Sequence, residues 1–195
     1  MKYNLSEVVE LIKDRRSIRP ELYSDRKVHK EIVASVLNSA IWAPTHGMNQ
    51  PWRFKVFMGD GLKRLGEVLP GMYRDLTPSA KYKPEKEEKL RKRCEQVSVI
   101  TALVVQKDLS GRIPVQEEVA AMGCAVQNMM LHCTAYGLGS FWSSPKFVYS
   151  SEMAEFLDLE EGQQCVGLFY MGYPNADWPT SHRRPIEYVT EWIES

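Results

Sequence analysis

Apolar residues recur along this chain at two spacings, which separate the expected helices from the expected strands. Val8, Leu11 and Ile12 stand three or four positions apart, the spacing of a helix that buries one face. The same spacing, with Ser6 and Ser151 as expected N-caps, predicts helices over residues 6–15, 29–42, 62–70 and 151–157. Short apolar or alternating runs bounded by Gly and Pro predict strands over residues 51–58, 97–106, 138–142 and 165–171.

The longest apolar stretch runs from Val115 to Tyr136 and stops at a glycine. Between Val119 and Cys133 the polar residues are Gln127, Asn128 and His132. A helix that is apolar nearly all round belongs in the core of a protein or in a subunit interface. Its first turn carries two glutamates, which argues against a membrane span. We therefore expect a core helix with a dimer seam on its small residues, namely Ala120, Gly123 and Cys124.

Residues 71–93 have a different composition. The run 81–93 holds seven basic and three acidic side chains, so its net charge is 7 − 3 = +4. Taken alone, this run could bind nucleic acid. Its acidic residues alternate with the basic ones at helical distances, however, which is typical of a solvated helix with weak ion pairs. Over the whole chain 25 Lys and Arg balance 25 Asp and Glu, so we expect neither a nucleic-acid nor a membrane partner.

Length and cysteine usage bound the class of protein. A chain of 195 residues fits one domain, and we expect a single domain over residues 1–195. The first residues lack the pattern of a signal peptide. The four cysteines show no Cys-x-x-Cys spacing, which favours reduced thiols and a cytoplasmic protein. They are Cys94, Cys124, Cys133 and Cys165.

The turn at residues 43–51 is richer in polar side chains than a simple connection requires. Thr45, His46, Asn49 and Gln50 stand between an expected helix and an expected strand, with a proline at either end of the turn. Such a rigid turn can present several hydrogen-bonding groups to a ligand. The alternative for His46 is that it only fills the turn.

Phosphate-binding loops of the glycine-rich kinds are absent, as are a serine-nucleophile elbow and zinc-ligand spacing. No metal site is therefore expected, and any phosphate must be held by side chains. Arginines are suited to that task because they bind phosphate through two parallel hydrogen bonds. Two groups of arginines are available, Arg15-Arg16-Arg19 and Arg183-Arg184.

Five motifs resemble those of the FMN-dependent nitroreductase family and stand in the same order. The short length of the chain and the presence of His46 resemble the compact bacterial branch of that family. The five motifs are Arg15-Arg-Ser-Ile-Arg19, the turn Ala43-Pro44 with Asn49-Gln-Pro-Trp-Arg-Phe54, the long helix ending in Ala135-Tyr-Gly-Leu-Gly139, Gly167-Leu-Phe-Tyr-Met-Gly-Tyr-Pro174, and Arg183-Arg-Pro-Ile-Glu-Tyr-Val189. Each motif is weak alone, and together they cover nearly the whole chain.

The resemblance implies an α+β fold, with a mostly antiparallel central sheet flanked by helices, in an intertwined homodimer with FMN at the subunit interface. Arg15, Arg16, Ser17 and Arg183 would hold the phosphate and the flavin edge. Trp42 and His46 would approach from the partner subunit, with Asn49 and Gln50 near the ribityl and ring. Trp142, Ser143 and Ser144 would run beside the isoalloxazine. The sequence departs from the family pattern at Trp42, Thr45 and Asn49, which leaves the roles of Trp42, Met48 and Asn49 open.

As an enzyme, such a protein passes hydride from NADH or NADPH to FMN N5 and then electrons to a nitroaromatic, a quinone or a similar small electrophile, in a ping-pong cycle. The chemistry lies at the cofactor, so no catalytic side chain is predicted. Residues 71–93 would cover the flavin and select the acceptor. Alternatives on the same fold are ene-reduction, dehalogenation, oxidative use of flavin, or a non-catalytic flavin-binding dimer. The physiological acceptor, the preference between NADH and NADPH, and one- against two-electron transfer stay open.

Overall fold

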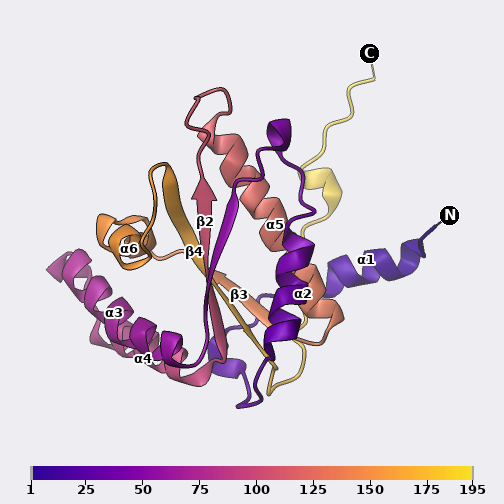
Figure 1. The fold of residues 1–195 in the computed structure, drawn as a ribbon. Coiled ribbons are helices and arrows are strands. Elements are labelled where there is room, and N and C mark those ends of the chain that lie inside the picture. The colour runs from indigo at the N-terminus through magenta and orange to yellow at the C-terminus, as the bar shows by residue number, and fades with distance from the viewer. Residues whose placement is uncertain (1, 195) are drawn as a thin grey trace.

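A four-stranded antiparallel sheet in the order β1-β2-β4-β3 forms the centre of the molecule, with helices on both faces (Figure 1). The computed structural model describes residues 2–194. The strands are β1 Trp52–Phe57, β2 Val99–Gln106, β3 Gly139–Ser143 and β4 Gln163–Gly172. The α-helices are α1 Leu5–Asp14, α2 Lys30–Ala40, α3 Asp60–Leu76, α4 Pro84–Gln96, α5 Val115–Ala135 and α6 Ser151–Phe156. Short 3-10 turns are η1 Pro20–Leu22, η2 His46–Met48, η3 Ser79–Lys81, η4 Lys146–Tyr149 and η5 Ile186–Tyr188. The predicted α+β fold, with an antiparallel central sheet flanked by helices, is confirmed.

Strand β2 is buried on both sides, which explains its unbroken apolar run. Val99, Leu103 and Val105 point into a core shared with α2 and α5. The alternate residues, Ile100, Ala102 and Val104, point into a second core shared with α3, η4 and α6. Two apolar cores on opposite faces of one sheet make a three-layered domain (Figure 1).

The predicted caps of two helices are wrong by one or two residues. Helix α1 is capped by Asn4, whose Oδ1 accepts a hydrogen bond from the Ser6 backbone N–H at 3.0 Å. Helix α6 is capped by Ser150, whose Oγ accepts from the Met153 N–H at 3.2 Å. In both cases a second capping-type residue stands close to the one chosen, so the sequence offers two equivalent starts.

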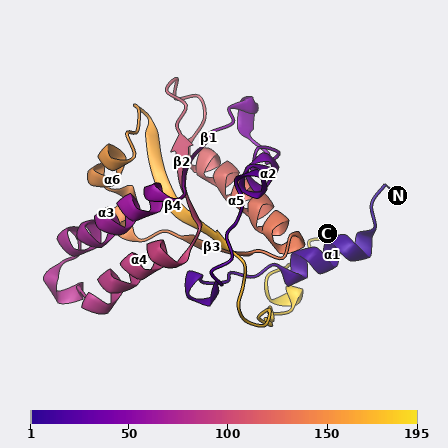
Figure 2. The ribbon, with the colours of Figure 1, turned by 60° about the horizontal axis from the view of Figure 1, so that its bottom comes forward.

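Helix α3 does not end near Pro70, as the sequence predicts, but continues to Leu76. A proline inside a helix removes one backbone hydrogen bond and crowds the preceding turn. Packing outweighs that cost here, because Leu65, Leu69 and Met72 keep the buried stripe going through the proline. Helix α4 lies beside α3 (Figure 2).

Helix α4 is only partly the solvated helix that the charge pattern predicts. Its exposed face carries the expected weak ion pairs, in which Glu88 lies 3.7 Å from both Arg91 and Lys92. Its last turn is buried, however, with Arg93 only 8 % exposed and Cys94 packed against α3. The Nε of Arg93 donates to a Glu21 carboxylate oxygen at 2.8 Å. This ion pair fixes α4 to η1.

Replacing Glu21 with Gln is expected to lower the free energy of unfolding at pH 7 by about 1–2 kcal/mol. The lower part of the range for charged hydrogen bonds applies because the Glu21 side chain is 33 % exposed and therefore screened. Burial acts to raise the pKa of Glu21, but hydrogen bonds from Arg93 and Lys89 outweigh it and hold the pKa at about 2.

The stability that this ion pair contributes depends on pH, in the direction set by the lowered pKa of Glu21. The folded pKa lies below that of an ordinary Glu, so the contribution is complete at neutral pH and is lost as the pH falls towards 2. Urea unfolding at pH 7 and pH 3 measures the difference in free energy of unfolding between Glu21→Gln and wild type. This difference should be smaller at pH 3. The matched control is Glu88→Gln. An equal difference at both values would contradict the assignment.

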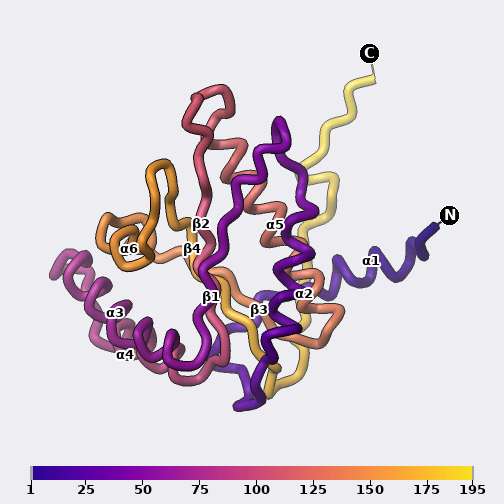
Figure 3. Tube along the Cα trace, viewed as in Figure 1, coloured from indigo at the N-terminus to yellow at the C-terminus, as the bar shows by residue number. Residues whose placement is uncertain are grey.

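Both ends of the chain project on the α5 side of the sheet (Figures 1 and 3). Helix α1 buries none of its residues within the subunit, although Leu5, Val8 and Ile12 form an apolar stripe. The C-terminal segment likewise carries exposed apolar side chains, with Trp192 and Ile193 more than four-fifths exposed. Apolar surface of this extent is typical of a region that another protein covers.

Candidate functional site

Arg15 and Arg16 come close in space to Arg183, which stands more than 160 residues later in the sequence. The indole N–H of Trp178 donates to the Asp14 carbonyl at 2.7 Å, and the Nε of Arg16 donates to the Pro179 carbonyl at 2.9 Å. These bonds fold the C-terminal segment back against the end of α1. They bring Arg183 close to Arg15.

The resulting cluster is a concentrated positive charge. The pKa of Arg15 is lowered by its burial, and further by the charges of Arg183 and Arg16. Among residues 2–194, no carboxylate lies within ion-pair distance of these three arginines. Like charges held together without a carboxylate favour binding of an anion.

The three arginines differ in what their donors already bind. Arg16 donates to the carbonyls of Lys13, Arg15 and Pro179, so it holds the backbone of this region. Arg183 donates through one Nη1 to Ser181 Oγ at 2.7 Å and to the His182 carbonyl at 2.9 Å. Arg15 has no hydrogen-bond partner for its guanidinium within the described part of the chain. Arg15, assisted by Arg183, is therefore best placed to bind an anion, and Arg16 is a positioning residue.

Strand β3 leads from this cluster to the predicted ring-side residues. Ser17 forms a parallel bridge to Ser140, and the Ile18 N–H donates to the Ser140 carbonyl at 2.9 Å. Ser143 lies three residues further along β3, or roughly 10 Å. The strand therefore separates Ser17 from Ser143 by a fixed distance.

The Trp142 side chain packs closely against strand β4 at Gly167, which has no Cβ atom. A Cβ atom added at Gly167 would lie 2.1 Å from the Trp142 indole nitrogen, so only glycine permits this contact. The Trp142 side chain nevertheless remains 36 % exposed. Ser144, the next predicted residue, is exposed at the end of the strand.

The polar turn before β1 is fastened to the start of helix α5. The Nδ1 of His46 lies 2.5 Å from Glu117 Oε2, and Asn49 Nδ2 donates to Glu118 Oε1 at 2.8 Å. Thr45 Oγ1 accepts from the Gln50 N–H at 3.1 Å. These bonds hold two non-glycine residues in the left-handed region, Met48 at φ 55° and Gln50 at φ 49°. Backbone strain of that kind persists only where neighbouring contacts fix it.

Glu117 and Glu118 were not singled out from the sequence as site residues. Glu118 is 2 % exposed, and the same oxygen that binds Asn49 also accepts from the Asp108 N–H at 2.6 Å. Two adjacent glutamates at the start of an otherwise apolar helix were the available signal. Their role is to position the turn.

Within one subunit the turn and the arginine cluster do not come together. The turn binds the first residues of α5, whereas α1 packs beside its last turns, near Leu131 and Tyr136. Helix α5 has 21 residues and is therefore about 31 Å long. Trp42 is 84 % exposed and borders the groove between α1, α2 and α5.

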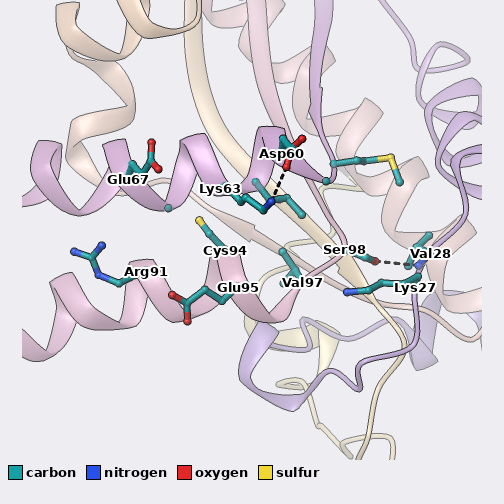
Figure 4. A pocket seen from close by; sticks show the side chains of 14 residues that line it. Lys27, Val28, Asp60, Lys63, Glu67, Arg91, Cys94, Glu95, Val97 and Ser98 are labelled. Atoms are coloured by element: carbon teal, nitrogen blue, oxygen red, sulfur yellow. Dashed lines mark hydrogen bonds and ion pairs between the residues drawn. The ribbon is translucent and has the colours of Figure 1, made fainter.

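A cavity of about 730 Å³ lies elsewhere, between α3, α4 and the segment at Lys27 (Figure 4). Its lining mixes acidic and basic side chains, and Asp60 and Lys63 satisfy each other at 2.7 Å. None of the predicted site residues borders it. A second cavity of about 480 Å³ does border Ser143 and lies between α3, α4 and η4. This second cavity is the candidate substrate-binding site because it lies beside a predicted site residue, although it is smaller than the first.

Comparison with known proteins decides the family. The model of the nitroreductase family matches residues 12–173 of the chain. The chain belongs to the nitroreductase family. Arg15, Ser17, the polar turn and Ser143 fall within the matched residues, and Arg183 lies beyond them.

Individual relatives support the same assignment. YfhC of Bacillus subtilis, a candidate NAD(P)H nitroreductase, is 25 % identical over 178 residues, which are 91 % of this chain and 89 % of YfhC. The crystal structure of a nitroreductase-like protein from Bacillus cereus superposes with a TM-score of 0.83 at 27 % identity, covering 100 % of this chain and 99 % of the other. A candidate nitroreductase from Desulfovibrio desulfuricans, crystallised in complex with FMN, has a TM-score of 0.71 at 25 % identity, with 100 % and 99 % covered.

Two classes of site are not found within the described residues. No group of three or more His, Cys, Asp or Glu in residues 2–194 lies close enough to hold a metal ion. No helix formed by these residues combines the length and apolar character that crossing a bilayer requires.

Proposed function

We propose that this nitroreductase-family protein is an FMN-dependent NAD(P)H oxidoreductase that reduces nitroaromatics, quinones or similar small electrophiles in a ping-pong cycle. The observation that carries the proposal is the meeting of Arg15 and Arg183 beside the start of β3. Its family membership and the FMN bound by the Desulfovibrio relative support it.

The residues present fit FMN. The phosphate is a doubly charged anion, and Arg15 and Arg183 supply permanent positive charge without a carboxylate to compete. Ser17 adds a hydroxyl beside them. Ser143, Ser144 and the indole of Trp142, at the other end of β3, would line the ring. When bound, FMN supplies the hydride and electron transfer between the nicotinamide and the acceptor.

The chain's own residues orient the cofactor. Hydrogen bonds from Arg16 to the segment 13–15, the bond that joins Ile18 to β3, and the contact of Trp142 with Gly167 fix both ends of the proposed site before FMN binds. A site organised in advance loses little conformational entropy on binding. The polar turn is organised in the same way, by Glu117 and Glu118.

We propose further that the active protein is a homodimer. His46, Asn49 and Gln50 lie at the opposite end of α5 from the α1 side of the subunit, so they can complete a flavin site only in a partner. Trp42 would also be contributed across the interface. Ala120 and Cys124 on α5 are exposed in the single subunit, as are the apolar faces of α1 and the C-terminal segment. Together these surfaces offer the large apolar area typical of obligate dimers.

The proposal places residues 71–93 over the acceptor's side of the flavin. This segment borders the cavity next to Ser143. Tyr73 and Tyr82 pack against each other at 5.8 Å between ring centroids. The proposal includes a cytoplasmic location, where the four free thiols would stay reduced.

Steady-state kinetics test the proposed reaction. Initial rates measured over a grid of NADPH or NADH and a nitroaromatic or quinone should give parallel double-reciprocal lines, because the two substrates take turns at one site. Intersecting lines would contradict the ping-pong cycle. Absence of turnover by the protein with its flavin bound would favour a non-catalytic flavin carrier.

A further inference from the structure

The charged side chains of helix α4 border two different surfaces of the helix. Lys86, Lys89, Leu90 and Arg93, at helical positions i, i+3, i+4 and i+7, border the 480 Å³ cavity beside Ser143. Glu85 and Glu88 border a different surface of the helix, together with Lys92 and with Lys89, which borders both surfaces. Of the charged side chains on α4, only basic ones therefore border the cavity beside Ser143.

The lining of this cavity is basic without an acidic residue. Its charged members are Lys81, Lys86, Lys89, Arg93 and Lys146. Lys89 and Arg93 share the carboxylate of Glu21, at 3.0 and 2.8 Å. Lys81, Lys86 and Lys146 have no carboxylate within ion-pair distance among residues 2–194. These three ammonium groups are available to a ligand.

The uncharged part of the lining is mostly apolar, with Tyr73, Thr77 and Ser143 as its polar members. Its apolar members include Leu90 on α4, Phe147 on η4, Leu76 and two prolines. A cavity of about 480 Å³ lies within the range of small-molecule sites. Apolar walls with cations around them fit a flat aromatic body that carries a negative group.

We infer that this cavity selects anionic aromatic electron acceptors, such as nitroaromatic carboxylates, with Lys81, Lys86 and Lys146 attracting the anionic group and Leu90 and Phe147 contacting the ring. The inference rests on the proposed function, because Ser143 at the cavity's edge is the residue assigned beside the flavin. It adds a substrate class and the residues that select it.

The double variant Lys81→Gln/Lys86→Gln tests the selection. Its kcat/KM for 4-nitrobenzoate should fall about tenfold, because two charge contacts are lost and solvent screens each of these exposed lysines. Its kcat/KM for the neutral 4-nitrobenzamide should stay within about twofold of wild type. The matched control, Lys30→Gln/Lys92→Gln, removes the same charge from α2 and the other face of α4 and should leave both values unchanged.

Three results would overturn the inference. One is an equal loss for the acid and the amide. Another is a changed preference for NADPH over NADH with the acid-to-amide ratio intact, which would assign the cations to the dinucleotide's phosphate. A third is loss of FMN in the double variant, which would make the cavity part of the flavin site.

Direct binding separates this inference from the proposed function. Calorimetric titration with 2-naphthoate and 2-naphthamide requires no electron transfer. Tighter binding of the acid by wild type, abolished in Lys81→Gln/Lys86→Gln, would support the anion site even in a protein that reduces nothing. Equal affinity for acid and amide in wild type would refute it.

Discussion

Replacing Arg15 with alanine is expected to weaken FMN binding by roughly 10- to 150-fold, and Arg183→Ala should have an effect of the same order. Each arginine contributes a charge-assisted contact of about 1.5–3 kcal/mol to the phosphate. The chain has no glycine-rich phosphate loop to share that contribution. Titration of the apoprotein with FMN, followed by flavin fluorescence, measures the change.

Riboflavin supplies the control for this prediction because it carries the same ring without the phosphate. Wild type should bind FMN more tightly than riboflavin, and Arg15→Ala should remove most of that difference while leaving riboflavin affinity unchanged. Arg184→Ala controls for loss of one positive charge from the same segment. FMN affinities within twofold of wild type in both Arg15→Ala and Arg183→Ala would remove these arginines from the phosphate site.

Gly123→Leu is expected to weaken the dimer by about 1–3 kcal/mol, the usual cost of overpacking a tight interface. Within the described subunit, a Cβ at Gly123 would meet no atom within 4 Å. Loss of a glycine from a helix interior should by itself favour the helix by up to about 1 kcal/mol. Any destabilisation must therefore come from a partner packed on α5.

Sedimentation over a range of concentrations measures that loss. The control is Gly71→Leu in helix α3, where an added Cβ would lie 3.7 Å from the Arg74 side chain, an ordinary contact. Gly71→Leu should leave the dimer intact. A well-folded wild-type monomer at micromolar concentration would refute the interface, and the shared flavin site with it.

The strands could be predicted closely because their signals are local. The predicted strands begin and end within two residues of the observed strands, and the run 97–106 is buried on both faces as its composition indicates. Helix α3 was predicted too short because Pro70 is a local signal, whereas the packing of Met72 that extends the helix is not. Rules based on neighbouring residues fail where a contact with a residue distant in the sequence determines the length of an element.

The candidate site shows the same division. The arginines and the polar turn could be selected from residue type and order, but the meeting of Arg15 with Arg183 depends on the Trp178 and Arg16 bonds. Which charged side chains of α4 border the cavity depends on how the helix packs against α3 and η4. The hold of Glu118 on Asn49 joins residues 69 positions apart. The sequence does not indicate which residues these contacts join.

Anaerobic mixing of the FMN-loaded protein with NADH or NADPH is the most direct test of the proposed oxidoreductase. The visible absorbance of the bound oxidised flavin should be lost with at least one nicotinamide. It should return when a nitroaromatic or a quinone is added in the absence of oxygen. A bound flavin that stays oxidised with both nicotinamides, or a purified protein that binds no FMN, would contradict the proposed function.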